Sequence, residues 1–356
     1  MELYLSPFAS DVSIPWLQHL LVHEYRHVVQ MSSLNRGFTK GLYFLFGEQA
    51  IGLISGLYTP KWLLEGDAVA TETALTHGGR GRSASFVQEM RALTLSDNFP
   101  KYDAAYNGSY AERYPNYYHM GYYTVAYLRQ KYGADVLASV FDKCGRKSWS
   151  ITPFNRALRN ISGKRKAALY SEALSWWKTL WRSEMDSIEP TPYTSWQIKR
   201  KAYADYHLPK FTQQGIVAYK ESPETLSRFV FIDTAGKEST LFIPSQRNEI
   251  NYDVNDSLLV WTERHNHVRW ENADRSVIKI MDIKNRKCRT LRAECFYTSV
   301  SLSAGGDSLV VVSTHLDSRQ TIDVIDLEGR LLRRIEMPQA VNVTSPIIAT
   351  DGTVYA

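Results

Sequence analysis

The sequence is poor in cysteine, with only Cys144, Cys288 and Cys295 among 356 residues. Their spacing matches no metal-binding or redox motif, and an odd number excludes a complete disulfide framework. Free buried thiols are the simpler interpretation, while a single bridge between Cys288 and Cys295 stays open. The cysteines therefore do not indicate a cellular compartment.

Long hydrophobic runs and a strong charge of one sign are also missing. The most apolar stretches, around residues 41–57 and 309–313, are short or interrupted, so no membrane span is expected. The net charge of +5 is too mild to indicate a nucleic-acid partner. Residues 1–5 lack the basic and apolar segments of a signal peptide, so none is expected in this chain.

What is present is the composition of a folded protein, with 44% hydrophobic and 22% charged residues and a length that predicts two domains. From residue 205 onward, short β-branched runs between Gly, Asp and Asn are typical of strands. We therefore expect a multidomain α and β protein, with a mainly helical domain at 1–204 and an all-β domain at 205–356. Helical spacing of apolar residues predicts helices at 14–34, 39–57, 62–77, 83–97, 117–132, 134–143, 153–161 and 164–186, after a short strand at 2–5.

The β half repeats itself. Asp233, Asp282 and Asp326 each end a strand in a tight turn, at intervals of 49 and 44 residues, and a basic, apolar return strand follows each. Four short strands in about 40–50 residues are what a propeller blade requires. Residues 205–356 hold about three such units, whereas propellers close with roughly four to eight blades. We expect a partial β-propeller that continues beyond residue 356; the alternative is a complete small domain of three sheets.

The clearest chemical motif is His23-Glu24-Tyr25-Arg26-His27, inside the helix expected at 14–34. Residues i and i+4 lie on one helix face, so both imidazoles can bind a single ion. Glu24 lies one residue round the helix, where it can contact a metal-bound water without being a ligand. The alternative is two surface histidines on an ordinary amphipathic helix. Apolar neighbours on both sides favour the metal site.

A catalytic zinc ion needs a third protein ligand and one open position. Glu65, in the apolar segment 60–68, is the candidate, because a carboxylate buried there without a partner would be costly. The alternative is that Glu65 caps a helix. Glu72 lies two turns further on the same face, where it could accept a hydrogen bond from a ligand histidine. Asp67 is the second candidate for that role, and His19 extends the histidine stripe as a neighbour of the ligands.

His23–His27 followed by Trp62-Leu-Leu-Glu65-Gly-Asp-Ala and Glu72 resembles the gluzincin metallopeptidases, in particular the peptidase-MA-like relatives of the aminopeptidase N family. The resemblance covers roughly residues 1–185 and implies a zincin-type catalytic domain with Glu65 as the third zinc ligand. It also implies that the tyrosine of a Y-x-x-G helix start stabilises the oxyanion. Tyr118-His-Met-Gly121 matches this element, although the neighbouring Tyr117 and Tyr122 stay open as alternatives.

The sequence departs from the family pattern in two ways. The interval from His27 to Glu65 is longer, which implies an inserted helical hairpin at 39–57. The G-x-M-E-N motif that captures a substrate's amino terminus is absent, so the resemblance does not imply aminopeptidase activity. The repeats at 205–356 are similar to TolB-type propeller blades. The combination implies an extracytoplasmic protein of the periplasm or cell envelope.

These features predict zinc-dependent hydrolysis of peptide bonds. His23, His27 and Glu65 would hold Zn²⁺, Glu24 would be the general base and, by the resemblance, Tyr118 would stabilise the oxyanion. The expected substrate is a peptide or protein. The propeller is expected to limit access of substrates or to bind a protein partner. The alternative is a zinc-binding cell-envelope scaffold or binding protein without catalysis. Glu24 and Tyr118 argue against it, because neither is needed to hold zinc.

Overall fold

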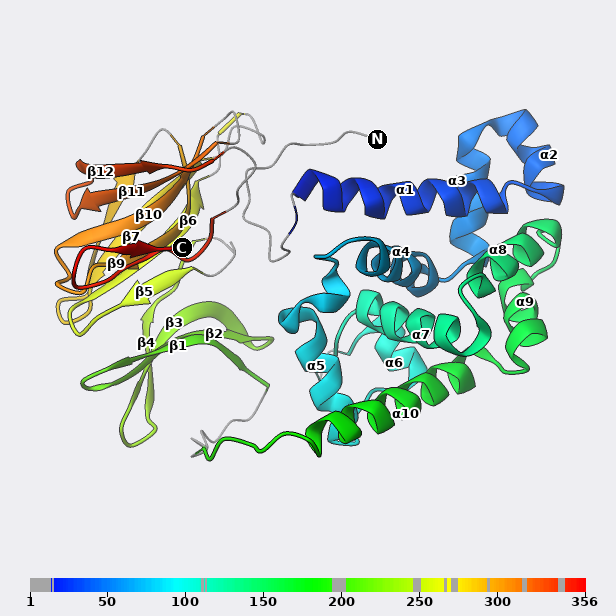
Figure 1. Cartoon of the computed structure of the whole chain (residues 1–356), viewed down its shortest axis with the longest axis horizontal. Coiled ribbons are helices and arrows are strands. Elements are labelled where there is room, and N and C mark those ends of the chain that lie inside the picture. Colours follow the sequence, from blue (N-terminus) through cyan, green and yellow to red (C-terminus); the bar gives the residue numbers. More distant parts are fainter. Residues whose placement is uncertain are drawn as a thin grey trace. The chain divides into compact units, whose positions relative to one another are not determined.

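The structure, a computed structural model, describes residues 14, 16–109, 112, 114–193, 203–245, 251–265, 268–269, 275–292, 295–315, 319–338 and 343–356. These residues divide between Pro192 and Tyr193 into two compact units, one helical and one of antiparallel strands (Figure 1). A multidomain protein with helices in its first half and sheets in its second half is thus confirmed. The division expected at residues 204–205 falls directly before β1 (Asp205–Thr212).

Several helices of the helical unit begin and end at residues that are recognisable start and stop signals in the sequence. The Asn116 side chain accepts a hydrogen bond from the Tyr118 amide at the start of α7, and Gly133, with a φ of 93°, follows its end. Pro153 occupies the first turn of α9. The elements within the described residues are α1 (Trp16–Leu34), α2 (Gly37–Phe46), α3 (Glu48–Tyr58), α4 (Lys61–Leu75), the 3-10 turn η1 (Arg80–Arg82), α5 (Ala84–Leu95), α6 (Tyr102–Asn107), α7 (Tyr117–Tyr132), α8 (Val136–Arg146), α9 (Pro153–Ser162) and α10 (Lys166–Met185).

The prediction of a single helix at 39–57 was wrong, because the segment forms the two helices α2 and α3. Gly47 separates them with a φ of 66°, which glycine adopts readily but which a right-handed helix does not continue through. The Gly47 amide donates to the Tyr43 carbonyl and closes α2. The inserted hairpin implied by the long interval between the two motifs is therefore present. The short helix α6 was not predicted, since six residues carry little periodicity.

The core of the helical unit lies between α4 and α7. Trp62 from α4 and Met120 and Tyr123 from α7 are fully buried there. The two helices cross at Gly66 and Gly121, where a Cβ atom on Gly66 would lie only 2.2 Å from the Gly121 carbonyl carbon. Only glycine permits such a close approach of two backbones. This crossing holds Glu65, the residue before Gly66, near the first turn of α7.

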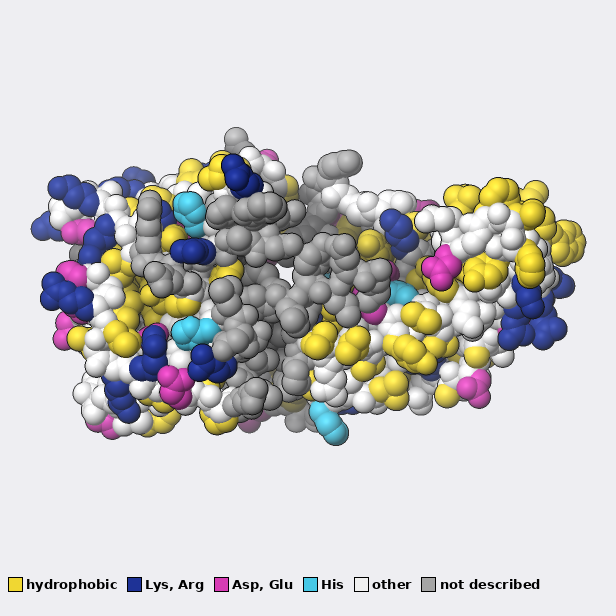
Figure 2. Space-filling model, turned by 90° about the horizontal axis from the view of Figure 1, so that it is seen from above, with side chains coloured by type: hydrophobic (Ala, Val, Ile, Leu, Met, Phe, Trp, Pro, Cys, Tyr) yellow, Lys and Arg dark blue, Asp and Glu magenta, His cyan; other side chains and the backbone are white. Residues whose placement is uncertain are grey.

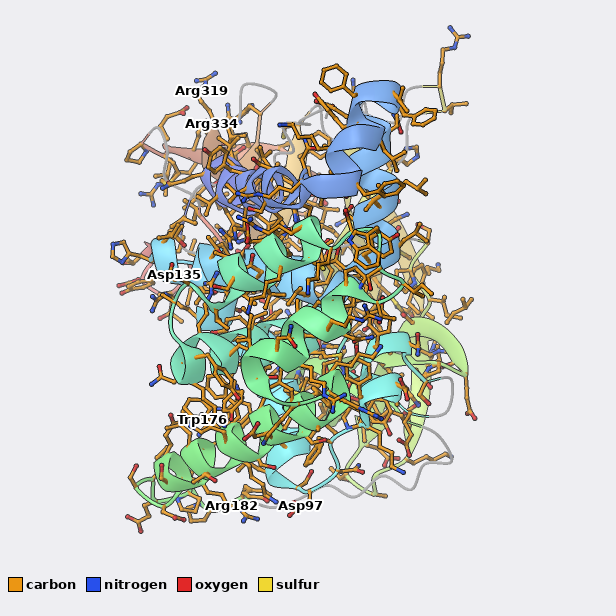
Figure 3. The ribbon with its side chains drawn as sticks, turned by 90° about the vertical axis from the view of Figure 1, so that its right-hand side faces the viewer. Asp97, Asp135, Trp176, Arg182, Arg319 and Arg334 are labelled. Atoms are coloured by element: carbon orange, nitrogen blue, oxygen red, sulfur yellow. The ribbon has the colours of Figure 1, made fainter. Side chains whose placement is uncertain are left out.

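Helix α10 covers the other side of α7. The Trp177 indole N–H donates to the Tyr123 carbonyl at 2.9 Å. Figure 3 shows Arg182 of α10 beside Asp97, and the Arg182 Nη2 atom lies 3.5 Å from the Asp97 carboxylate. These contacts place α7 and the residues that follow α5 beside one helix.

The β unit consists of antiparallel sheets whose strands follow one another in sequence. Within the described residues, three sheets have four strands each and one has two strands. The strands are β1 (Asp205–Thr212), β2 (Gly215–Ser222), β3 (Thr225–Asp233) and β4 (Glu238–Phe242); β5 (Tyr252–Val254), β6 (Leu258–His265), β7 (Arg275–Asp282) and β8 (Lys287–Arg292); β9 (Phe296–Leu302), β10 (Ser308–Thr314), β11 (Gln320–Asp326) and β12 (Leu331–Glu336); and β13 (Ile347–Ile348) with β14 (Val354–Tyr355).

The predicted repeat corresponds to these four-stranded meanders. Asp233, Asp282 and Asp326 end the third strand of each, and each carboxylate accepts hydrogen bonds from backbone amides of the turn that follows. A short polar side chain that binds its own turn is a common way to begin a hairpin. No closed barrel or propeller is detected among the described strands.

The remaining expectations concern cysteines, membrane spans and the first strand. All three cysteines are free, so the bridge between Cys288 and Cys295 is not formed, and only Cys144 is buried. In the part of the chain that the structure describes, no helix is long and apolar enough to cross a membrane. The strand expected at 2–5 lies outside the described residues.

Candidate metal centre

The H-E-x-x-H motif lies in the middle of α1, and both of its histidines face α4. Glu65 lies in the second turn of α4, so it does not cap that helix. Its Oε2 atom is 3.2 Å from His23 Nε2 and 3.4 Å from His27 Nε2, and the two Nε2 atoms are 3.3 Å apart. The three predicted ligands thus present an almost equilateral triangle of donor atoms.

A triangle of this size fits a tetrahedral zinc ion. Zn–N and Zn–O bonds of about 2.0–2.1 Å at the tetrahedral angle place neighbouring ligand atoms about 3.3–3.4 Å apart. Two imidazoles and one carboxylate are also the ligands of catalytic zinc sites that keep the fourth position open. The side chains of His27 and Glu65 are 21% and 22% exposed, so water can reach the group. Among the described residues, these three side chains form the group that could hold a metal ion.

Glu72 orients the first histidine. Its fully buried carboxylate accepts a hydrogen bond from His23 Nδ1 at 2.9 Å. We assign the proton to Nδ1 because the carboxylate must accept, and this leaves the Nε2 lone pair directed into the triangle. Arg80 Nη2 is 2.8 Å from the same Nδ1, but a guanidinium carries only donors, and it donates to Glu72 Oε2 at 3.1 Å. The other carboxylate oxygen of Glu72 lies 3.0 Å from His19 Nε2.

Gln30 orients the second histidine. His27 Nδ1 donates to Gln30 Oε1 at 2.9 Å, and Gln30 Nε2 donates to Asp67 Oδ2 at 2.8 Å. Asp67 is fully buried and also accepts from Arg26 Nε at 2.7 Å and from Arg129 Nη2 at 2.6 Å. The hypothesis that Asp67 contacts a ligand histidine was therefore wrong in detail, because Gln30 lies between them. The two arginines balance the buried charge.

The carboxylates give the site a negative potential. Burial opposes the ionisation of Glu65, but hydrogen bonds from His23 and His27 outweigh it and lower the Glu65 pKa to about 2. Burial also opposes the ionisation of Glu72, yet its three donors hold the pKa of Glu72 well below its usual range. Burial lowers the pKa of each ligand histidine, but hydrogen bonds to Glu65 and to other neighbours raise both pKa values above normal. The arrangement therefore favours a positive charge between the histidines.

Tyr118 lies in the first turn of α7, close enough to Glu65 for an electrostatic interaction with its carboxylate. Burial, followed by the negative charge of Glu65 and the neighbouring Tyr117, raises the pKa of Tyr118 well above its usual range. The phenol therefore stays protonated at neutral pH and can donate a hydrogen bond. Tyr122 instead packs edge-to-face against Phe86, with ring centres 5.7 Å apart. Tyr118 therefore lies near the ligand group, and Tyr117, the other alternative, stacks on it with ring centres 4.9 Å apart.

Glu24 follows His23 in α1 and is half-buried. No hydrogen bond or ion pair joins its carboxylate to the described residues. A carboxylate that accepts no hydrogen bond from the described residues, next to a candidate metal ligand, is suited to accept a proton from water.

Two residues of the site were not identified from the sequence. Gln30 lies three residues after His27, so the same helical spacing that paired the histidines could have indicated it. Arg80 lies in η1, outside any periodic segment, and no sequence signal pointed to it. Besides contacting Glu72, its guanidinium carbon is 5.1 Å from the centre of the Tyr118 ring. Arg80 thus contacts both Glu72, which binds His23, and Tyr118, the predicted oxyanion donor.

Comparisons with known proteins do not assign the chain to a family. No protein-family model matches it, and no curated protein matches it. Among solved structures it is similar to dipeptidyl peptidase 4 of Porphyromonas gingivalis over 40% of this chain and 27% of that chain, with 9% identity and a TM-score of 0.31. It is also similar to a eukaryotic initiation factor, with 17% identity, coverage of 40% and 35%, and a TM-score of 0.29.

A third similar structure is hydrazine synthase of Kuenenia stuttgartiensis, with 14% identity, coverage of 39% and 50%, and a TM-score of 0.25. The chain spans half or less of each of these three proteins. Likenesses with TM-scores this low carry no argument about fold or activity. The interpretation of the site rests on its own geometry.

Proposed function

We propose that this protein is a zinc-dependent peptidase of the gluzincin type, with His23, His27 and Glu65 as the zinc ligands. The observation that carries the proposal is the triangle of donor atoms with edges of 3.2, 3.3 and 3.4 Å, which fits three corners of a zinc tetrahedron. The resemblance of the two motifs to gluzincins supports a peptide bond as the substrate. Without the G-x-M-E-N motif, nothing supports a preference for free amino termini.

The roles of the residues follow from their places around the triangle. Zinc bound there would polarise the scissile carbonyl and lower the pKa of a water molecule at the open position. Glu24 would accept a proton from the attacking water and pass it to the leaving amine. Tyr118 would donate a hydrogen bond to the carbonyl oxygen as negative charge develops on it. Glu72 and Gln30 would keep both Nε2 lone pairs directed at the ion.

The β unit is proposed to be part of a β-propeller. Its three four-stranded meanders, each with strands in sequential order, support this, because a propeller blade has that topology. In a peptidase, such a unit would limit access of substrates or bind a protein partner.

Metal analysis combined with a digest tests the proposed function. The purified full chain is expected to contain one equivalent of zinc and to cleave casein or members of a peptide library. EDTA should abolish cleavage, zinc should restore it, and Glu65→Gln should lose most of the bound zinc because one of three ligands is weakened. Glu224→Gln, on an exposed turn of the β unit, is the matched control and should keep both properties. Failure to bind zinc contradicts the proposal, and full zinc occupancy without cleavage supports the non-catalytic alternative.

Tyr118→Phe tests the proposed oxyanion donor. Loss of one donor to the developing charge typically lowers kcat by about 10²–10³-fold, so a decrease of about 10²-fold is expected, with KM and zinc content unchanged. Tyr122→Phe, one turn further along α7, should leave kcat within a few-fold of the original. Equal effects of the two substitutions in steady-state kinetics would remove Tyr118 from this role.

A further inference from the structure

Much of the α2–α3 hairpin is an exposed apolar surface. In α2 only Thr39 is buried, and Phe44, Leu45 and Phe46 at its end are 87%, 76% and 66% exposed. We call these last three residues the hairpin tip. Exposed hydrophobic side chains are ordinary when they are scattered, but a consecutive run of large ones marks an interaction surface.

The apolar surface extends beyond the hairpin tip. It continues along both helices and onto the loop that follows α8. The Ser148 hydroxyl in that loop accepts a hydrogen bond from the Thr39 amide at 3.2 Å, which places the loop beside α2. Figure 2 shows hydrophobic side chains gathered at this end of the helical unit, with Lys and Arg side chains beside them. The further exposed residues are Phe38, Leu53, Leu57, Trp149 and Ile151.

Basic side chains lie beside this apolar surface. Two of them lie at the start of α2 and three at the end of α8. The two helices touch there, since a Cβ atom on Gly37 would lie 3.1 Å from the Arg146 carbonyl oxygen. All five side chains are exposed: Arg36, Lys40, Lys143, Arg146 and Lys147.

Few acidic residues oppose this positive charge. Between residues 35 and 64 the only acidic residue is Glu48, at the start of α3. In α8, Asp142 is shared by Arg36 at 2.6 Å and Arg146 at 2.8 Å. The lysines at the edge of the apolar surface therefore keep a net positive charge.

We propose that the α2–α3 hairpin docks on an anionic lipid surface, with the hairpin tip in the acyl region and the basic residues at the headgroups. Aromatic and aliphatic side chains flanked by lysine and arginine are what interfacial membrane helices present. Lys40 lies one helical turn before Phe44, so its long side chain can extend back to a phosphate while the ring is buried. The charge complementarity selects anionic lipid over neutral lipid.

The same charges disfavour a second copy of this chain as the partner. In a symmetric dimer through this face, Lys40, Lys143 and Lys147 of both copies would lie at the same interface. Like charges brought together at an interface weaken association, whereas phosphate headgroups attract them.

Vesicle co-sedimentation of the full chain tests the proposal. Binding is expected to vesicles of phosphatidylcholine with phosphatidylglycerol, and much less to phosphatidylcholine alone. The variant with Phe44→Ser, Leu45→Ser and Phe46→Ser should partition at least about tenfold more weakly, because three apolar side chains no longer insert. The variant with Lys40→Glu, Lys143→Glu and Lys147→Glu should lose the preference for anionic vesicles. High salt should weaken binding of the original chain in the same way.

The control changes an exposed apolar pair on the other unit, Leu331→Ser with Leu332→Ser in β12, and should bind as the original does. Circular dichroism of each variant checks that the helices are retained. No vesicle binding, equal binding to both vesicle types, or binding unaffected by the tip substitutions would each overturn the proposal. Light scattering that shows a dimer, made monomeric by the tip substitutions, would assign the surface to a second copy instead.

Discussion

Glu24→Gln is expected to abolish peptide hydrolysis while zinc stays bound. The amide keeps the shape of the side chain but cannot accept a proton, and general-base catalysis typically contributes about 10²–10⁴-fold. We therefore expect kcat/KM to fall by about 10³-fold or more, measured with the best substrate from the peptide digest. Zinc should remain bound, because no hydrogen bond or ion pair joins the Glu24 carboxylate to the described residues that surround the candidate ligands.

The comparison with a ligand variant separates the two roles. Glu65→Gln should lose zinc and activity together, whereas Glu24→Gln should lose activity alone. If hydrolysis by Glu24→Gln remained near the original level at full zinc occupancy, the general base would have to be another group. If zinc were lost as well, Glu24 would belong to the binding site rather than to the reaction.

The three candidate ligands could be picked out from the sequence because each helix places its own members of the group on one face. His23 and His27 are separated by about one helical turn, so they share a face wherever α1 lies. Glu65 and Glu72 are two turns apart on α4, and both meet that face in the structure. The spacing of residues within a helix thus indicates which side chains share a face.

The rest of the site depends on contacts between segments that are distant in sequence. Arg80 reaches Glu72 and His23 from a short turn whose position no periodicity defines. Asp67 was expected next to a histidine, but Gln30 fills that place and Asp67 binds Arg26 and Arg129 instead. Which polar group completes a buried network is decided by packing, and spacing along one helix does not reveal it.

Packing also explains why glycines lie close in sequence to Glu65 and Tyr118. Gly66 follows Glu65, and Gly121 lies three residues after Tyr118, and these two glycines are the point where α4 and α7 touch. A Cβ atom on Gly121 would lie 2.0 Å from the Trp62 carbonyl oxygen, which is backbone and cannot move aside by rotation. The crossing therefore sets how closely Glu65 on one helix approaches Tyr118 on the other.

Gly121→Ala is consequently expected to have the largest effect on stability. Forcing a methyl group into this contact must separate the two helices. Overpacking typically costs about 1–3 kcal/mol, and a clash with backbone places this substitution at the upper end of that range. Urea unfolding of the full chain, followed by the circular dichroism of the helices, should show the loss. In the fraction that still folds, we expect zinc binding to be weaker, because Glu65 moves with α4 relative to α1 and α7.

Gly52→Ala is the matched control, since Gly52 lies inside α3 and a Cβ atom there would meet nothing within 4 Å. An alanine in an open helical position loses less backbone entropy on folding than glycine does, so this variant should gain about 0.5–1 kcal/mol. The same substitution would then have opposite signs at two helical positions. A loss of similar size at both positions would mean that helix geometry rather than the α4–α7 contact explains the effect. Opposite signs would tie the stability of the unit to the backbone contact that brings Tyr118 towards Glu65.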